Sequence, residues 1–155
     1  MNNTWKLLIC FALVFAAAAG GSIATYDAIP TWYAGLTKPP FNPPNWIFGP
    51  VWTLLYALMA FSLFLIWKVK KSKKQTKAIK VFLVQLFLNF LWSIVFFGAH
   101  NIGLALLTIV LLWGSILYSI ILFYKINKTA SYLLIPYILW VSFASILNLS
   151  IYLLN

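Results

Sequence analysis

Side chains that usually carry acid–base or metal chemistry are almost missing from this sequence. Asp27 is the only acidic residue, His100 the only histidine and Cys10 the only cysteine. General acid–base catalysis by two carboxylates needs a second acid, and a zinc site needs three or four ligands. A single cysteine leaves no internal disulfide from which to infer the redox compartment. The sequence therefore predicts neither a classical catalytic constellation nor a metal site.

Aromatic and amide side chains are the residues whose spacing suggests a site instead. Three sets recur at intervals of three and four, which places each set on one face of a helix. The sets are Gly49, Trp52, Tyr56 and Met59; Gln85, Asn89, Trp92 and Phe96; and Pro136, Trp140, Ala144 and Asn148. Amides inside a membrane normally face a bundle interior or a cavity. They can equally join neighbouring helices by hydrogen bonds. Small Ala144 and Gly49 beside large aromatics favour a cavity.

A second concentration of aromatics lies in the segment WYAGLTKPPFNPPNWIFGPVW, from Trp32 to Trp52. It combines three tryptophans, a tyrosine and two phenylalanines with five prolines. Each proline fixes φ and removes a backbone donor, so the segment is stiff. Connections between helices are usually shorter than this. The segment predicts a shaped lid at the membrane surface.

The elements that must position these residues are membrane-spanning helices. The chain is 64% hydrophobic and 8% charged over 155 residues. A span takes roughly 20 apolar residues, and five runs are long enough. They lie at about Trp5–Tyr26, Trp46–Trp67, Ile79–Ala99, Gly103–Tyr124 and Tyr132–Leu153. No stretch remains for a soluble domain. The sequence predicts an all-α membrane protein, a five-transmembrane-helix bundle forming one domain over residues 1–155.

The first of these runs also resembles a secretory signal peptide, because Lys6, an apolar core and AAAAGG follow one another. Its apolar character continues through Ile23 and Ala24, which gives spanning length. We therefore expect a retained helix. Ala16, Gly20 and Ala24 recur every four residues, and small residues at that period let helices approach closely in lipid.

The lysines predict the orientation of the five spans. Ten of them fall on the side that holds the N-terminus and the second and fourth loops, and only Lys38 falls on the other side. This asymmetry follows the positive-inside rule. We expect an integral multi-pass protein of a bacterial plasma membrane with a cytoplasmic N-terminus. The net charge of +10 does not indicate nucleic-acid binding, because no folded domain presents the lysines. The lipid bilayer is the partner that they fit.

The segment WYAGLTKPPFNPPNWIFGPVWTLLYALM resembles the signature of the TspO/translocator protein family, also called tryptophan-rich sensory proteins or peripheral-type benzodiazepine receptors. QLFLNFLWSIVFF and LLIPYILWVSFASILNLSIY resemble the third and fifth helices of that family. The resemblance implies a five-helix bundle, usually a homodimer, with a ligand cavity under the first loop. It implies a receptor for tetrapyrroles such as protoporphyrin and haem, and for isoquinoline carboxamide or benzodiazepine-type ligands, with no cofactor required.

The resemblance also implies the residues that line the cavity. By position these are Trp32, Tyr33, Pro44, Trp46, Trp52, Tyr56, Asn89, Trp92, Trp140, Ala144 and Asn148. Some family members promote light-dependent breakdown of protoporphyrin. If this chain does so, electron-rich indoles must touch the porphyrin, and Trp52 and Trp140 are the candidates. One departure concerns cholesterol, because no Lys or Arg follows Tyr152 as in the pattern of animal members.

Two other functions fit the same sequence. A small-molecule transporter for porphyrin or lipid would also need an interior cavity with a lid. Five helices give no even inverted repeat, however, and no charge lies in the interior of a span to couple ions. The other alternative is a structural or regulatory membrane protein whose aromatics fill a packed core. Ligand flux across proteoliposomes would identify the first, and the absence of tryptophan quenching by ligand the second.

Overall fold

The computed structural model describes residues 1–155 and is entirely helical. Five helices are long and apolar enough to cross a membrane, as predicted. The elements are α1 (Asn3–Ala28), the 3-10 turn η1 (Tyr33–Gly35), α2 (Asn45–Trp67), α3 (Lys73–Ser93), the π-helical turn η2 (Ile94–Gly98), α4 (Ile102–Tyr124), α5 (Lys128–Leu133) and α6 (Ile135–Leu154). The third span comprises α3 with η2, and the fifth comprises α5 with α6.

Most of these helices have a residue with a short polar side chain at the N-cap position. The side chains of Asn2, Ser72, Asn101 and Asn127 each accept a hydrogen bond from the backbone N–H three residues further along. Such caps satisfy a donor that has no partner within the helix. The third and fifth spans begin earlier than hydropathy predicts, at Lys73 and Lys128, because these caps extend the helices through polar residues.

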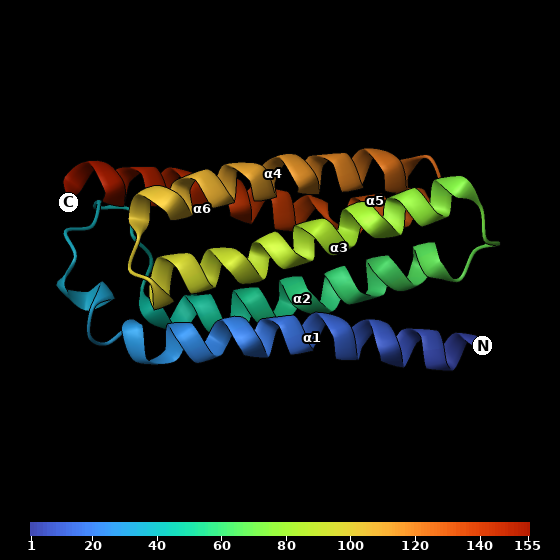
Figure 1. Ribbon diagram of the computed structural model, residues 1–155, viewed down its shortest axis with the longest axis horizontal. Helices are drawn as coiled ribbons and strands as arrows, with labels where there is room; N and C mark the ends of the chain where they lie inside the picture. Colours follow the sequence, from blue (N-terminus) through green and yellow to red (C-terminus); the bar gives the residue numbers. More distant parts are fainter.

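The N-terminus and the α2–α3 and α4–α5 connections lie at one end of the bundle (Figure 1). The α1–α2 loop and the C-terminus lie at the other end (Figure 1). Ten of the lysines thus lie towards one end, and Lys38 lies at the end with the loop. This arrangement matches the expected odd number of spans. The end that carries the α1–α2 loop is called the loop end below.

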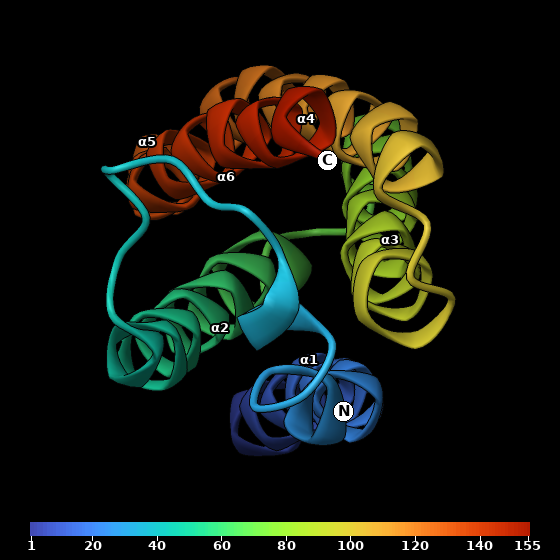
Figure 2. The same ribbon diagram turned by 90° about the vertical axis from the view of Figure 1, so that its left-hand side faces the viewer.

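Seen along its long axis, the bundle places its helices around a ring in the order α1, α2, α5 with α6, α4 and α3 (Figure 2). The α1–α2 loop runs across the loop end of this ring (Figure 2). Small residues bring α1 close to α3: a Cβ added at Gly20 would lie 2.7 Å from the Phe90 ring, and one at Gly21 would lie 3.3 Å from Ser93. The close approach expected of this small-residue patch is therefore made within the chain.

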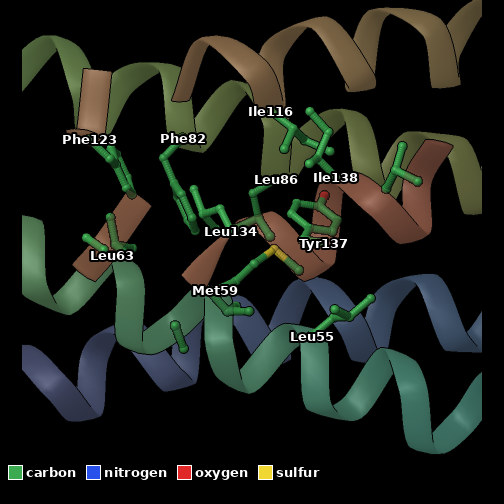
Figure 3. Packing of buried hydrophobic residues seen from close by; sticks show 14 of the residues in the cluster. Leu55, Met59, Leu63, Phe82, Leu86, Ile116, Phe123, Leu134, Tyr137 and Ile138 are labelled. Atoms are coloured by element: carbon green, nitrogen blue, oxygen red, sulfur yellow. The ribbon is translucent and has the colours of Figure 1, made fainter. Parts of the chain in front are cut away.

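The main hydrophobic core fills the half of the bundle away from the loop. Side chains from α2, α3, α4 and α6 interdigitate there, among them Met59, Phe82, Ile116 and Tyr137 (Figure 3). These four are fully buried, with relative exposures of 0%. A smaller cluster around Tyr33, Phe96 and Leu147 lies near the loop. Between the two clusters the helices leave a cavity.

Candidate ligand cavity

The cavity has a volume of about 520 Å³ and lies in the loop half of the bundle. Small-molecule sites are typically about 300–1,000 Å³ and mostly apolar. Four spans and the loop contribute to its wall. The lining residues are Phe15, Ala18, Ala19, Gly21, Ser22, Thr25, Tyr26, Ile29, Tyr33, Asn45, Phe48, Gly49, Trp52, Thr53, Tyr56, Trp92, Ser93, Phe96, Phe97, Trp140, Ala144, Leu147, Asn148 and Ile151.

Aromatic rings form the side of the cavity made by α2, α3 and α6. The Trp52 and Tyr56 rings lie on successive turns of α2, with centroids 5.5 Å apart. Trp92 stacks on Phe96 at 5.3 Å, on the third span. Trp140 contacts Phe48 edge-on at 6.2 Å, which joins α6 to the start of α2. Offset and edge-on aromatic geometry adds about 0.5–1.5 kcal/mol per pair beyond burial. The rings therefore hold one another in place along the cavity wall.

A buried hydrogen-bond chain closes the floor. The Tyr56 hydroxyl donates to Asn89 Oδ1 (2.8 Å), and Asn89 Nδ2 donates to the Tyr137 hydroxyl (2.8 Å). The Tyr137 hydroxyl donates in turn to Gln85 Oε1 (2.7 Å). This chain joins α2, α3 and α6 just above the main core. Asn89 thus serves as a link between helices, and its two amide atoms are both engaged.

Asn148 is also tied to neighbours, although it lines the cavity. Its Oδ1 accepts a hydrogen bond from Trp92 Nε1 (3.0 Å), and its Nδ2 donates to the Ile102 carbonyl (3.1 Å). The Trp92 indole is therefore fixed in orientation by α6. The sequence left two roles open for such amides, lining a cavity and joining helices by hydrogen bonds. Asn148 does both.

The loop closes the end of the cavity through several contacts. Tyr33 is 3% exposed, and its hydroxyl donates to Asn42 Oδ1 (2.8 Å). Burial raises the pKa of the Tyr33 phenol to about 12, so this donor stays protonated at neutral pH. The Asn155 side chain clasps Thr37: the Thr37 N–H donates to its Oδ1 (3.1 Å), and its Nδ2 donates to the Thr37 carbonyl (2.8 Å). The loop is thereby bound to the end of α6.

Charge is absent from the cavity wall, since no Lys, Asp or His lines it. Lys38, the one cation at the loop end, caps the loop itself. Its Nζ donates to the carbonyls of Tyr33 (2.8 Å), Ala34 (3.4 Å) and Leu36 (3.1 Å), and it lies 4.8 Å from the centre of the Tyr33 ring. No three His, Cys or acidic side chains gather in a way that could hold a metal ion.

Of the site residues expected from the sequence, seven line the cavity. They are Tyr33, Trp52, Tyr56, Trp92, Trp140, Ala144 and Asn148. Asn89 lies one layer behind the wall, beneath Tyr56. Trp32 stacks on His100 at 4.4 Å and braces the loop against the α3–α4 turn. Pro44 precedes the first residue of α2, and Trp46 is 73% exposed, so neither reaches the cavity.

Other lining residues were not expected, and the largest group of these lies on α1. Ala18, Ser22 and Thr25 follow helical spacing on that helix and leave space beside the aromatics. In the sequence, small residues of this helix, Ala16, Gly20 and Ala24, serve only as a helix-packing signal. Leu147 and Ile151 extend the Trp140–Asn148 face of α6 by further turns and could have been found by continuing that spacing.

The fold and the site together define an integral multi-pass helical membrane protein with an uncharged aromatic cavity beneath a loop. The sequence matches the TspO/MBR family model over residues 9–154, and the chain belongs to this family. It is 44% identical over 153 residues to the tryptophan-rich protein TspO of Archaeoglobus fulgidus, covering 99% of both chains. Its identity to the protein of that name from Chlorobaculum tepidum is 40% over 153 residues, 96% of this chain and 95% of the other. The human translocator protein is 38% identical over 119 residues, 76% of this chain and 70% of the other.

Proposed function

We propose that this protein is a membrane receptor or sensor that binds tetrapyrroles such as protoporphyrin and haem, and isoquinoline carboxamide or benzodiazepine-type ligands, in the aromatic cavity. The observation that carries the proposal is the uncharged cavity of about 520 Å³ walled by Trp52, Trp92 and Trp140. Flat aromatic ligands gain contact area and offset stacking on such rings. Family membership supports the binding of a small hydrophobic ligand.

The polar ends of a porphyrin would face the loop. The amides of Asn89, beneath the aromatic wall, and of Asn148, in the wall, are already engaged with protein partners. Lys38 is the nearest cation to the cavity mouth, and its ammonium can reach a propionate only by giving up some of its bonds to loop carbonyls. Ligand binding and loop conformation are therefore coupled in this proposal.

We further propose that the indole of Trp52 or Trp140 gives one electron to a light-excited porphyrin and recovers it once dioxygen has added to the porphyrin. Both oxygen atoms then end in the cleaved ring, and the indole is regenerated. Both indoles line the cavity. The change Trp52→Phe with Trp140→Phe keeps two aromatic faces but removes the readily oxidised indoles. Dark binding of protoporphyrin should persist, while light-driven loss of its Soret band slows sharply.

A titration of the purified protein with protoporphyrin, first in the dark and then illuminated, tests both claims. Saturable quenching of tryptophan fluorescence in the dark supports the receptor function, and no quenching refutes it. Breakdown at the wild-type rate in the double variant would assign the chemistry to free singlet oxygen. Breakdown no faster than in a detergent control would leave a binding protein alone.

Transport remains the alternative function, and the lower half of the bundle argues against it. A carrier needs access from both membrane faces, but the floor is closed by the Tyr56–Asn89–Tyr137–Gln85 chain above a packed core. Protoporphyrin flux across proteoliposomes tests this alternative, and measurable flux would favour it over the receptor.

We also propose that the protein forms a homodimer in a bacterial plasma membrane with its N-terminus cytoplasmic. The family resemblance supports the homodimer, and the lysine asymmetry between the two ends supports the orientation. Light scattering of the protein in detergent micelles over a range of protein concentrations tests the dimer, and a monomer at all concentrations would refute it.

A further inference from the structure

The wall of the cavity is not equally closed on all sides. The lining residues of α3, α6 and the loop are all buried or half-buried. The exposed lining residues belong only to α1 and α2. They are Ala19, Ser22 and Tyr26 on α1, and Asn45, Gly49 and Thr53 on α2. In a spanning bundle, these positions face lipid on the loop half of the membrane. The cavity is therefore continuous with the seam between the loop halves of α1 and α2.

We propose that this seam, defined by Ser22, Tyr26, Gly49 and Thr53, is the portal through which ligands dissolved in the loop-side leaflet enter and leave the cavity. The inference rests on the proposed receptor function and specifies its route. A flat apolar ligand partitions into the bilayer, so its local concentration is highest where the portal opens. The ligand then enters and leaves without passing through the loop.

Helix packing leaves this seam unfilled. The small face of α1 is used against α3, where a Cβ at Gly20 would lie 2.7 Å from Phe90. On the side towards α2, a Cβ at Gly49 would meet no atom within 4 Å. Further from the loop the seam closes, because Phe15 of α1 and Tyr56 of α2 meet with ring centroids 6.2 Å apart. At the lysine end, Lys6 Nζ donates to the Trp67 carbonyl (3.3 Å).

Polar groups at the seam are satisfied within their own helices. The hydroxyl of Ser22 donates to the Ala18 carbonyl (2.9 Å), and that of Thr53 donates to the Gly49 carbonyl (2.8 Å). Hydrogen bonds thus do not join the two helices along the portal, and its widening breaks none. Pro50 lies inside α2 beside Gly49 and lacks an N–H, so the first turn of the helix is held less firmly.

The loop presents a higher barrier to the same ligand. Passage there would break the two hydrogen bonds between Thr37 and Asn155, and would displace the buried Tyr33 with its bond to Asn42. Each of these hydrogen bonds adds net stability to the closed loop. The seam is the route that requires no such loss.

Rates distinguish a portal from a wall. Narrowing a portal slows association and dissociation together and leaves Kd unchanged, whereas altering a wall contact changes Kd mainly through dissociation. The test variants are Gly49→Leu and Ser22→Leu, with Gly49→Ala as a smaller step. The matched control is Gly114→Leu on α4, because a Cβ there also meets no atom within 4 Å and Gly114 does not line the cavity. Asn155→Ala loosens the loop and tests the competing route.

Stopped-flow quenching of tryptophan fluorescence by protoporphyrin, with the protein in lipid nanodiscs, gives both rates. Empty nanodiscs report the partitioning step. Gly49→Leu should lower both rate constants at least about tenfold with Kd within about threefold, while Gly114→Leu and Asn155→Ala keep wild-type rates. Faster exchange in Asn155→Ala with unchanged rates in Gly49→Leu would place the route at the loop and overturn the portal. If Gly49→Leu changes Kd through the dissociation rate alone, Gly49 is a contact in the cavity wall, and the portal proposal is also overturned. Absence of quenching in the wild type would refute the receptor function itself.

Discussion

The hydrogen-bond chain beneath the cavity predicts that removal of a single oxygen atom lowers the free energy of unfolding substantially. Tyr137→Phe deletes a hydroxyl that accepts from Asn89 Nδ2 (2.8 Å) and donates to Gln85 Oε1 (2.7 Å). Asn89 is 3% exposed and Gln85 is 1% exposed, so water cannot replace the lost partner. Each buried polar group left alone costs about 1–3 kcal/mol. Hydrogen-bonded pairs in membranes average nearer 0.6 kcal/mol, so we expect a combined loss of about 1–3 kcal/mol for the two orphaned groups.

Equilibrium unfolding in mixed micelles of increasing dodecyl sulfate content, followed by circular dichroism, measures this loss. Tyr132→Phe is the control, because Tyr132 is 58% exposed and its hydroxyl makes no hydrogen bond within the protein. Adding Gln85→Leu to Tyr137→Phe should cost less than the sum of the single changes, since the pair shares one bond. Protoporphyrin affinity should persist, because Tyr137 does not line the cavity. A loss below about 0.5 kcal/mol, or strict additivity, would refute the stabilising role of the chain.

Three further outcomes test the orientation, the cavity and the loop. In a background without the native cysteine, a cysteine at Ser72 should react with an impermeant reagent only from the cytoplasmic side, and one at Thr37 only from outside. Labelling of both from one side would contradict the five-span orientation. Trp140→Ala should weaken protoporphyrin binding by about 1–3 kcal/mol, whereas Trp67→Ala, far from the cavity, should not; equal losses would mean that both act through the fold. Because the phenol of Tyr33 has its pKa raised to about 12 from 10.0, the unfolded state ionises first, and stability should fall as the pH rises from 10 to 12. Tyr33→Phe should flatten that part of a denaturation profile, and an unchanged slope would argue against the burial of the phenol.

The spans could be predicted because their signals are local. Apolar length identifies each helix, and the lysine distribution tests the count without further information. Spacing on single helices also gathered Trp52 with Tyr56 and Trp140 with Ala144, all of which line the cavity. The boundaries were less accurate at the lysine-rich end of α3, where a Ser72 cap starts the helix among charged residues.

Contacts between distant segments lay beyond such spacing. Nothing near Thr37 indicates that Asn155 clasps it, because the two residues are 118 positions apart. Helical spacing correctly places Asn89 on the same face of α3 as Trp92. The Tyr56 hydroxyl, however, donates to Asn89 and lies between it and the cavity. A tryptophan in an aromatic segment can equally face outwards, as Trp46 in the first turn of α2 does at 73% exposure. Which helix lies opposite decides these outcomes, and periodicity does not contain that information.

The persistence of an empty volume in the loop half follows from how α1 is anchored. Large rings from α2, α3 and α6 would gain packing contacts if α1 lay directly against them. Here Gly20 and Gly21 allow α1 to pack closely against α3, and a Cβ at Gly98 would lie 3.5 Å from Ala24. The interface between α1 and the third span is therefore filled. The residues that α1 turns towards α2, such as Ala18 and Ser22, are too short to reach the rings. Because α1 packs against α3 and presents short side chains towards the loop half of α2, a space remains that a flat ligand can fill, and the same asymmetry leaves that space open towards the lipid.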